Sequence, residues 1–377
     1  MNTPSFKEDH ISQIPALQLL QTLGYTYLSP AEVDTLRGGK TTNVLLEDVL
    51  RKQLKHINAE KQISSTRTTY ISNANIENGI RALKELPMQE GYINASQHLY
   101  NLITLGKTFE QNFDGDKKSI TLQYIDWHHL ENNVFHVTEE FSVVRSSGKE
   151  HYRPDIVLFV NGIPLCIIEC KRPDSKNAIR QAISQHLRNQ QEGGIRNLYV
   201  YAQLLLSKAT NAAAYATNGT PEKFWAQWRE QEKSALNPTE TYETKLAVLK
   251  NTSVKSSDQR MFSERFAYVE RYFTELGNEP VEVTEQDRYL YSLCRPERLM
   301  DLIYNFTLYD DGTKKVARYQ QFFAVKKTLR QIQSTEGGKR KGGVIWHTQG
   351  SGKSLTMVML AQAIAMAPFI RNPKIVL

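Results

Sequence analysis

Two acidic residues and a lysine lie beside a pair of apolar segments in the middle of the chain. Asp155 comes directly before one segment, and Glu169 and Lys171 mark the end of the next. Hydrolysis of a phosphodiester needs a divalent cation, because the attacking water must lose a proton and the developing charge must be neutralised. Two carboxylates can hold Mg²⁺ in an oxygen shell, and a nearby ammonium group can orient the water or stabilise the transition state. These residue types fit a nuclease site, although a strand-start aspartate beside a solvated Glu169–Lys171 ion pair would give the same spacing.

The two apolar segments, Ile156 to Val160 and Ile163 to Glu169, are predicted to be antiparallel strands. Asn161-Gly162 between them is a strong turn signal. Residues two apart on a strand share a face, so Glu169 and Lys171 point to the same side of the sheet.

The register of this hairpin decides whether the two carboxylates can meet. A strict two-residue turn places Asp155 opposite Ile168, on the face away from Glu169. A bulge, or a three-residue loop with Gly162 in a left-handed conformation, would pair Asp155 with Ile167 and bring the carboxylates together. We therefore expect one of these two irregularities between Asp155 and Glu169.

Apolar periodicity elsewhere predicts further elements around this hairpin. The predicted helices are 45–57, 177–191, 262–273, 296–309 and 318–333, and the predicted strands are 141–144 and 198–206. A polar, turn-rich stretch at 234–259 indicates a boundary. Together these elements indicate an α/β protein.

A glycine-rich motif, HTQGSGKS at 347–354, lies near the C-terminus. Such a turn can wrap phosphates with its backbone N–H groups, and the dipole of a following helix adds to this attraction. Lys353 would reach the β- and γ-phosphates, and Ser354 would ligate Mg²⁺. We predict strands at 343–346 and 373–377, with a helix after Ser354. ATP is expected to bind through Thr348, Gly350, Ser351, Gly352, Lys353 and Ser354.

The segment RPDIVLFVNGIPLCIIECKRP, at 153–173, strongly resembles the nuclease motif of type I restriction R subunits, which belong to the PD-(D/E)xK superfamily. This resemblance implies that Asp155 and Glu169 bind Mg²⁺ and that Lys171 is the catalytic lysine. It also implies a nuclease core in which a mixed sheet is flanked by helices.

Three further polar residues match the superfamily less closely. Many of these nucleases carry Q-x3-Y on the helix after the lysine, for positioning DNA and the lysine. Gln185 is the best-placed glutamine, but residue 189 is asparagine, and Gln181 lies one turn earlier on the same face. Glu47 sits where the superfamily often has another acid. An ordinary solvated helix face remains the alternative for all three residues.

HTQGSGKS resembles the phosphate loop of superfamily 2 translocases in restriction R subunits, including His347 at its first position. RYQQFFA, at 318–324, resembles the Q-motif of that superfamily, and the pattern R-x-x-Q-x-x-A selects Arg318 and Gln321. A glutamine amide can pair with both the donor and the acceptor of the adenine edge. The segments 216–228 and 296–312 also look like this family, so the resemblance runs from about residue 135 to residue 377.

The order of nuclease then motor implies a type I rather than a type III restriction enzyme. The implied activity is that of a type I site-specific deoxyribonuclease, with Mg²⁺-dependent cleavage of double-stranded DNA coupled, in the full-length protein, to ATP-driven translocation. Modification (methyltransferase) and specificity subunits would be its partners. We expect an endonuclease domain at 1–255, a connector at 256–285 and a truncated first RecA-like motor domain at 286–377. No acidic motor motif follows the phosphate loop, so ATPase activity is expected only in the full-length subunit.

Two other functions remain open: a RecB-like repair nuclease-helicase, and a non-catalytic nucleotide-binding scaffold with a decayed nuclease fold. A net charge of +7 permits a polyanionic partner without requiring one. The three cysteines lack zinc-ligand spacing, no apolar run approaches the ~20 residues of a membrane span, and the polar start resembles no leader peptide. These features predict a cytoplasmic protein of a bacterium or archaeon with no membrane partner.

Overall fold

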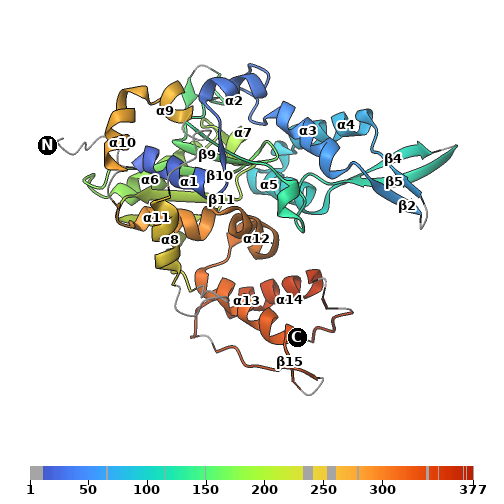
Figure 1. Cartoon of the computed structure of the whole chain (residues 1–377). Coiled ribbons are helices and arrows are strands. Elements are labelled where there is room, and N and C mark those ends of the chain that lie inside the picture. The colour runs from blue at the N-terminus through green and yellow to red at the C-terminus, as the bar shows by residue number, and fades with distance from the viewer. Residues whose placement is uncertain are drawn as a thin grey trace.

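A mixed sheet of six strands lies at the centre of the protein (Figure 1). The computed structural model describes residues 12–64, 67–113, 115–148, 150–231, 241–252, 260–277, 280–336, 339–346, 348–367, 369–370 and 372–376. Across the sheet the strands are β1 (Thr26–Tyr27), β6 (Phe135–Glu139), β9 (Ile156–Val160), β10 (Ile163–Cys170), β11 (Leu204–Ala209) and β12 (Ala212–Ala216). The pairs β1–β6 and β10–β11 are parallel, and the other neighbours are antiparallel. The mixed sheet predicted from the sequence is thus present.

Helices cover both faces of this sheet. Their bounds in the first two thirds of the chain are α1 Ile14–Thr22, α2 Pro30–Leu36, α3 Glu47–Ile57, α4 Asn73–Lys84, α5 Tyr92–Leu105, α6 Ala178–Asn189, α7 Arg196–Tyr199 and α8 Tyr242–Lys250. The short helices that follow are α9 Arg260–Glu264, α10 Glu270–Leu276 and α11 Glu285–Tyr289. Helix α6 packs on β10 and β11. On the opposite face, the β11 residue Lys208 donates hydrogen bonds to Ser12, just before α1, and to Gln286 of α11.

Four of the five small hairpins that lie outside the sheet in the described part of the chain come before residue 317. They pair β2 (Lys61–Ser64) with β3 (Arg67–Thr69), β4 (Lys107–Phe113) with β5 (Asp116–Leu122), β7 (Val143–Val144) with β8 (His151–Tyr152), and β13 (Thr307–Asp310) with β14 (Thr313–Val316). The β4–β5 hairpin extends away from the sheet (Figure 1).

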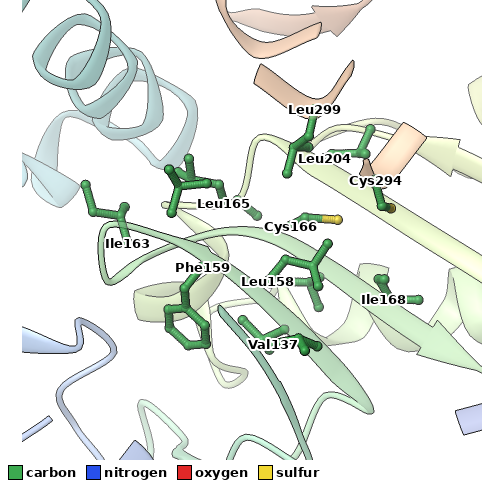
Figure 2. Close-up of a cluster of buried hydrophobic side chains, with 14 of the residues drawn as sticks. Val137, Leu158, Phe159, Ile163, Leu165, Cys166, Ile168, Leu204, Cys294 and Leu299 are labelled. Carbon is green, nitrogen blue, oxygen red and sulfur yellow. The ribbon is translucent and has the colours of Figure 1, made fainter. Parts of the chain in front are cut away.

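The β9–β10 hairpin is buried along its whole length, as its nearly unbroken apolar sequence predicts. Figure 2 shows side chains from both strands in one cluster with Leu204 of β11 and with Cys294 and Leu299 from the C-terminal third. Complete burial of one such aliphatic side chain contributes roughly 1.5–3 kcal/mol to stability. The strands that bear Asp155 and Glu169 are therefore held rigidly at the centre of the core.

Two predicted elements between residues 141 and 206 are wrong in part. The strand predicted at 141–144 is reduced to Val143–Val144, and the sheet strand in this region is the preceding β6. The strand predicted at 198–206 begins only at Leu204, because α7 and a turn occupy the residues before it. In both places a run of apolar residues is buried, but its burial does not fix the backbone conformation.

The C-terminal third differs more from its prediction. The helix predicted at 262–273 is broken into α9, the 3₁₀ turn Ala267–Val269 and α10, and the helix predicted at 296–309 ends at Phe306, as α12 (Pro296–Phe306). A π-helical turn at Leu290–Cys294 joins α11 to α12. The segment Arg318–Gln333 is helical, as predicted: Arg318 caps α13 (Tyr319–Gln333), which packs against α14 (Lys353–Met366).

The strands predicted on either side of the phosphate loop do not form. Residues 343–346 and the described residues 373–376 have no strand pairing, and Val344 and Trp346 are largely exposed. A strand needs a neighbour to take its backbone hydrogen bonds. The two short strands that come before the loop in the chain, β15 (Thr335–Glu336) and β16 (Lys339–Arg340), pair with each other and not with residues 343–346. None of the described helices is long and apolar enough to cross a bilayer.

Candidate active site

A bulge in the β9–β10 hairpin sets the register that the site requires. Val160 pairs with Ile163 across a two-residue turn, but beyond Pro164 the register shifts, so that Ile156 pairs with Ile168. Continuing this register by one residue places Asp155 opposite Glu169. Proline has no N–H to give to the strand ladder, which accounts for an irregularity at this point.

The expected bulge is therefore confirmed, and Gly162 has the left-handed conformation with a φ of +83°. The three-residue loop, its alternative, does not form. The expected partner of Asp155 was wrong: the bulge adds a residue to β10, so Asp155 faces Glu169 rather than Ile167. The expected and the observed register have the same consequence, because each brings the two carboxylates to one face of the sheet.

Asp155 is fixed by backbone contacts on several sides. One oxygen of its carboxylate, Oδ2, accepts a hydrogen bond of 2.6 Å from the backbone N–H of Cys170. Its own carbonyl oxygen accepts hydrogen bonds from the Gln13 side chain, at 3.0 Å, and from the backbone N–H of Glu140, at 3.1 Å. The Asp155 side chain is 20% exposed, so the site is open to solvent at this residue.

Glu169 lies beside Asp155 but is completely buried. With both acids ionised, no donor among the described residues reaches either of its carboxylate oxygens. Burial raises the pKa of the Glu169 carboxyl well above its usual range, and the negative charge of Asp155 and a side-chain hydrogen bond to Asp155 raise it further. When Glu169 holds its proton, Asp155 is therefore its hydrogen-bond partner, and the oxygens lack a partner only in the ionised form. The positive charges of Lys171 and Arg188 act in the opposite direction. A buried carboxylate without partners costs free energy unless a cation neutralises it.

Lys171 completes the group on the same face. Its ammonium nitrogen lies 3.8 Å from Asp155 Oδ2 and donates a hydrogen bond of 2.7 Å to the carbonyl oxygen of Cys170. Its backbone N–H bonds to the carbonyl of Lys208, which continues the pairing of β10 with β11. The structure thus brings together all three residues predicted from the D…E-x-K pattern.

These residues fit a divalent cation such as Mg²⁺. In their ionised forms, the two oxygens of Glu169 and the Asp155 oxygen that does not bond to Cys170 are hard ligands of the kind that Mg²⁺ prefers. No third histidine, cysteine, aspartate or glutamate joins them within the described part of the chain. Water and substrate oxygens would therefore complete the shell, as is usual for this ion.

Ser207 is a neighbour of Glu169 that the sequence analysis missed. It pairs with Glu169 in the parallel β10–β11 register, so the two side chains lie on the same face. The Ser207 hydroxyl is buried and has no hydrogen-bond partner among the residues that the structure describes. Only the strand pairing brings it to the site, and the sequence carries no signal of that register.

A buried hydrogen-bonded chain holds α6 over β11 next to this site. His186 Nε2 lies 3.2 Å from the carbonyl oxygen of Leu206, so this nitrogen must carry the proton. Burial lowers the pKa of His186 to about 3, so the ring is neutral and Nδ1 accepts a 2.9 Å hydrogen bond from the Tyr199 hydroxyl. Asn189 in turn donates to that hydroxyl, at 3.4 Å.

Tyr199 thus places a tyrosine hydroxyl beside Asn189, the position where the Q-x3-Y pattern lacks its tyrosine. The hydroxyl arrives from α7, ten residues along the chain, so sequence spacing could not reveal it. Burial raises the pKa of Tyr199 well above its usual range, and the charge of Glu169 adds to this effect. This hydroxyl therefore stays protonated and acts by hydrogen bonding.

Replacing Tyr199 with phenylalanine should lower the free energy of unfolding by about 1–3 kcal/mol, because His186 Nδ1 and the Asn189 amide lose their buried partner. Urea unfolding measures this effect. Tyr70→Phe, at a residue that is 69% exposed, is the matched control and should change stability by less than about 0.5 kcal/mol. Equal stabilities for the two variants would show that the hydrogen bonds of Tyr199 to His186 and Asn189 do not stabilise the fold.

Gln181, Gln185 and Glu47 lie in different places. Gln185 is half-buried and lines a groove beside Lys171, while Gln181 lines the same groove and donates a hydrogen bond to the carbonyl of Lys176. Glu47 lies near the turn end of the hairpin, where it accepts a hydrogen bond from Lys84. Asp155 and Glu169 are at the opposite end, so Glu47 takes no part in the site.

The glycine-rich loop forms a second site. Gly350 and Gly352 have φ values of +75° and +81°, and no side chain caps the N-terminus of α14. The first N–H groups of this helix are therefore available to an anion. Thr348, Lys353 and Ser354 are exposed at this opening, and Ser351 bonds back to the carbonyl of Thr348. His347 lies outside the described residues.

Gln321 connects α13 to this loop. Its amide nitrogen donates to the carbonyl of Gly352 at 3.2 Å, and its amide oxygen accepts from the backbone N–H of Arg318 at 2.8 Å. Both residues line a cavity of about 330 Å³ beside the loop, to which β12 and residues 220–224 also contribute. Adenine recognition by Gln321 remains a prediction, and one donor and one acceptor position of its amide remain for it.

The chain is thus an α/β protein with an acidic site on a buried hairpin and a glycine-rich loop at a helix N-terminus. Residues 5–233 match the family described as "Type I restriction enzyme R protein N terminus", and residues 320–377 match the family described as "SWI2/SNF2 ATPase". The first match covers more than half of the chain, which therefore belongs to the family of type I restriction enzyme R proteins.

Curated relatives agree with this assignment. The chain is 27% identical to the putative type I restriction enzyme MjaIXP endonuclease subunit of Methanocaldococcus jannaschii, over 98% of this chain and 32% of the relative. It is 26% identical to the type I restriction enzyme HindI endonuclease subunit of Haemophilus influenzae, over 98% of this chain and 31% of the relative. The chain thus spans about a third of the length of these relatives.

Proposed function

We propose that this chain cuts double-stranded DNA in an Mg²⁺-dependent reaction at Asp155, Glu169 and Lys171. The observation that carries the proposal is the buried Glu169 carboxyl beside the Asp155 carboxyl, because no donor reaches the Glu169 oxygens when both acids are ionised and a divalent cation would stabilise that form. The names of the curated relatives, all endonuclease subunits, support a nuclease. The arrangement is consistent with the PD-(D/E)xK core expected from the motif.

The three side chains have separate parts in this chemistry. A bound Mg²⁺ would lower the pKa of a ligated water and neutralise charge on the phosphate. Asp155 and Glu169 would hold the ion, and the rigid hairpin keeps their separation constant. Lys171, fixed by the Cys170 carbonyl and by Asp155, presents a positive charge to the attacking water or to the transition state.

We further propose that the full-length protein is the endonuclease and motor subunit of a type I restriction system. Residues 318–354 would then bind ATP and a second Mg²⁺ at Ser354 as the front of a RecA-like motor, and ATP hydrolysis would drive DNA translocation. Modification and specificity subunits are the expected partners, in the bacterial or archaeal cytoplasm. Co-purification with a DNA methyltransferase would distinguish this system from a RecB-like repair nuclease-helicase.

The direct test is nicking of supercoiled plasmid by the 377-residue chain with and without Mg²⁺. We expect Mg²⁺-dependent nicking, and Lys171→Ala should slow it about 100-fold, because one charge at the transition state is lost. Lys117→Ala, at a 73% exposed residue of β5, should nick at the wild-type rate. Nicking that is insensitive to Lys171→Ala, or its absence in the wild-type chain, would contradict the proposal.

A further inference from the structure

An open groove runs along α6 beside the candidate active site. This α6 groove has a volume of about 790 Å³ and is lined by Lys171, Lys176, Arg180, Gln181, Gln185 and Arg188, among others. None of the described residues that line it is acidic. Four cationic side chains therefore surround one opening, which is suited to a polyanion.

Arg188 differs from the two cations of the groove that have an acidic partner. Lys171 is paired with Asp155, and Arg180 with Glu222 at 2.9 Å. Arg188 is exposed and forms no ion pair within the part of the chain that the structure describes. Its guanidinium donors are therefore available to a ligand.

Arg188 is nevertheless held in place. Its guanidinium lies 5.2 Å from the ring centre of Tyr152 in β8, within the range of a cation–π contact. Arg145 lies 4.8 Å from the same ring and is anchored by Glu150 and by the carbonyl of Gly193. The ring of Tyr152 is thereby fixed, and it supports an arginine side chain that would otherwise be mobile.

The spacing along α6 matches a nucleic acid strand. Gln181, Gln185 and Arg188 follow one another at intervals of one turn and lie on the face toward Lys171. Seven residues of helix span about 10 Å, and one DNA strand carries a phosphate about every 3.4 Å along the duplex axis. The face is therefore long enough to contact more than one phosphate of a strand.

We propose that the α6 groove holds the phosphate backbone of the DNA strand to be cut and that Arg188 binds a phosphate adjacent to the one at Asp155 and Glu169. This inference rests on the proposed nuclease function and names the residue that positions its substrate. Arginine is suited to the task because its planar fork of donors matches two phosphate oxygens. The charge of Arg188 already reaches the site, since it acts on Glu169.

The test is binding of a fluorescent DNA duplex to the 377-residue chain in EDTA, between 50 and 200 mM salt. We expect Arg188→Gln to weaken binding about tenfold and to reduce the slope of log K against log salt by about 0.9, the loss of one phosphate contact. Arg188→Lys should keep the slope, because it keeps the positive charge. It should bind DNA more weakly than wild type, because lysine lacks the planar guanidinium that donates two hydrogen bonds to one phosphate.

Arg271→Gln is the matched control, because Arg271 is 92% exposed and is paired with Glu275 on α10. It removes the same net charge outside the groove and should leave affinity and slope unchanged. A wild-type slope in Arg188→Gln, an equal change in Arg271→Gln, or no measurable binding by the wild-type chain would overturn the proposal. Because EDTA removes divalent cations, binding is measured without cleavage. Failure of the nuclease proposal would appear separately, in the plasmid assay.

Discussion

Replacing Glu169 with glutamine is expected to abolish Mg²⁺-dependent nicking and, at the same time, to make the protein more stable. Activity should fall at least about 10³-fold, because the amide is a poor ligand for Mg²⁺ and the charge that balances the ion is lost. Stability should rise by about 1–3 kcal/mol at pH 8 without divalent cations, because a buried charge beside Asp155 is removed. The glutamine amide also lacks partners, but it carries no charge.

The pH dependence of this gain has a definite sign. Burial raises the pKa of Glu169 above its ordinary value of 4.5, so the folded protein retains a proton that the unfolded chain releases. Glu169 therefore does not destabilise the fold below pH 4.5, and its cost grows as pH rises from 4.5 toward the raised pKa of the folded state. The difference in stability between wild type and Glu169→Gln should be small at pH 4.5 and larger at pH 8.

Urea unfolding at both pH values, with and without Mg²⁺, measures these effects. Mg²⁺ should stabilise the wild type, because it binds only the folded carboxylates, and should have little effect on the variant. Asp174→Asn is the control, since Asp174 is an exposed acid paired with Arg172 a few residues away. If Glu169→Gln were less stable than wild type at pH 8, the buried Glu169 carboxylate would not lower the stability of the fold as proposed.

The sequence predicts the active-site residues better than their surroundings because the residues and their register are local. Asp155, Glu169 and Lys171 lie within 17 residues, and the pleat of a strand fixes which of them share a face. Even the bulge follows from one requirement, that both carboxylates face one ion. Its direction could not be deduced, because one extra residue on either strand satisfies that requirement.

The remaining residues of the site come from strand pairing and helix docking that local sequence does not encode. Ser207 reaches Glu169 only because β11 pairs in parallel with β10 in one register. Tyr199 reaches Asn189 only because the segment expected to be a strand is partly helical. The match to Q-x3-Y fails in sequence, yet a tyrosine hydroxyl still lies beside Asn189, since a hydroxyl can be supplied by another element.

At the phosphate loop, the predicted loop conformation forms but the predicted flanking strands do not. Its glycines take the expected left-handed conformations, since those depend only on the loop and on α14. The strands predicted on both sides of it depend on neighbours in a sheet, and residues 343–346 have none among the described residues. Local motifs are therefore formed here while the elements that need distant partners are not.

Replacing Gly162 with alanine is the strongest test of how the hairpin positions the site. Gly162 has a φ of +83°, which costs an L-residue roughly 1–2 kcal/mol. A Cβ atom at this position would also lie 2.6 Å from the carbonyl oxygen of Leu46 and 3.1 Å from the backbone nitrogen of Leu50. Backbone atoms at the start of α3 cannot rotate away, so the turn must shift.

That shift would disturb more than the turn. The carbonyl of Gly162 accepts a 2.9 Å hydrogen bond from Leu46, and Asn161 beside it is bonded to Tyr124 and Asn133. We expect Gly162→Ala to lower the free energy of unfolding by about 3–5 kcal/mol, from strain, overlap and lost hydrogen bonds. Nicking should fall as well, because movement of the turn changes the register that places Asp155 opposite Glu169.

Gly39→Ala separates backbone strain from overlap. Gly39 has a similar φ of +69°, but a Cβ there would meet no atom within 4 Å. Its variant should therefore lose only about 1 kcal/mol and nick plasmid normally. If urea unfolding gave the same loss for both glycines, the contact with α3 would contribute nothing, and the register of the catalytic hairpin would have to be fixed by the bulge at Pro164 alone.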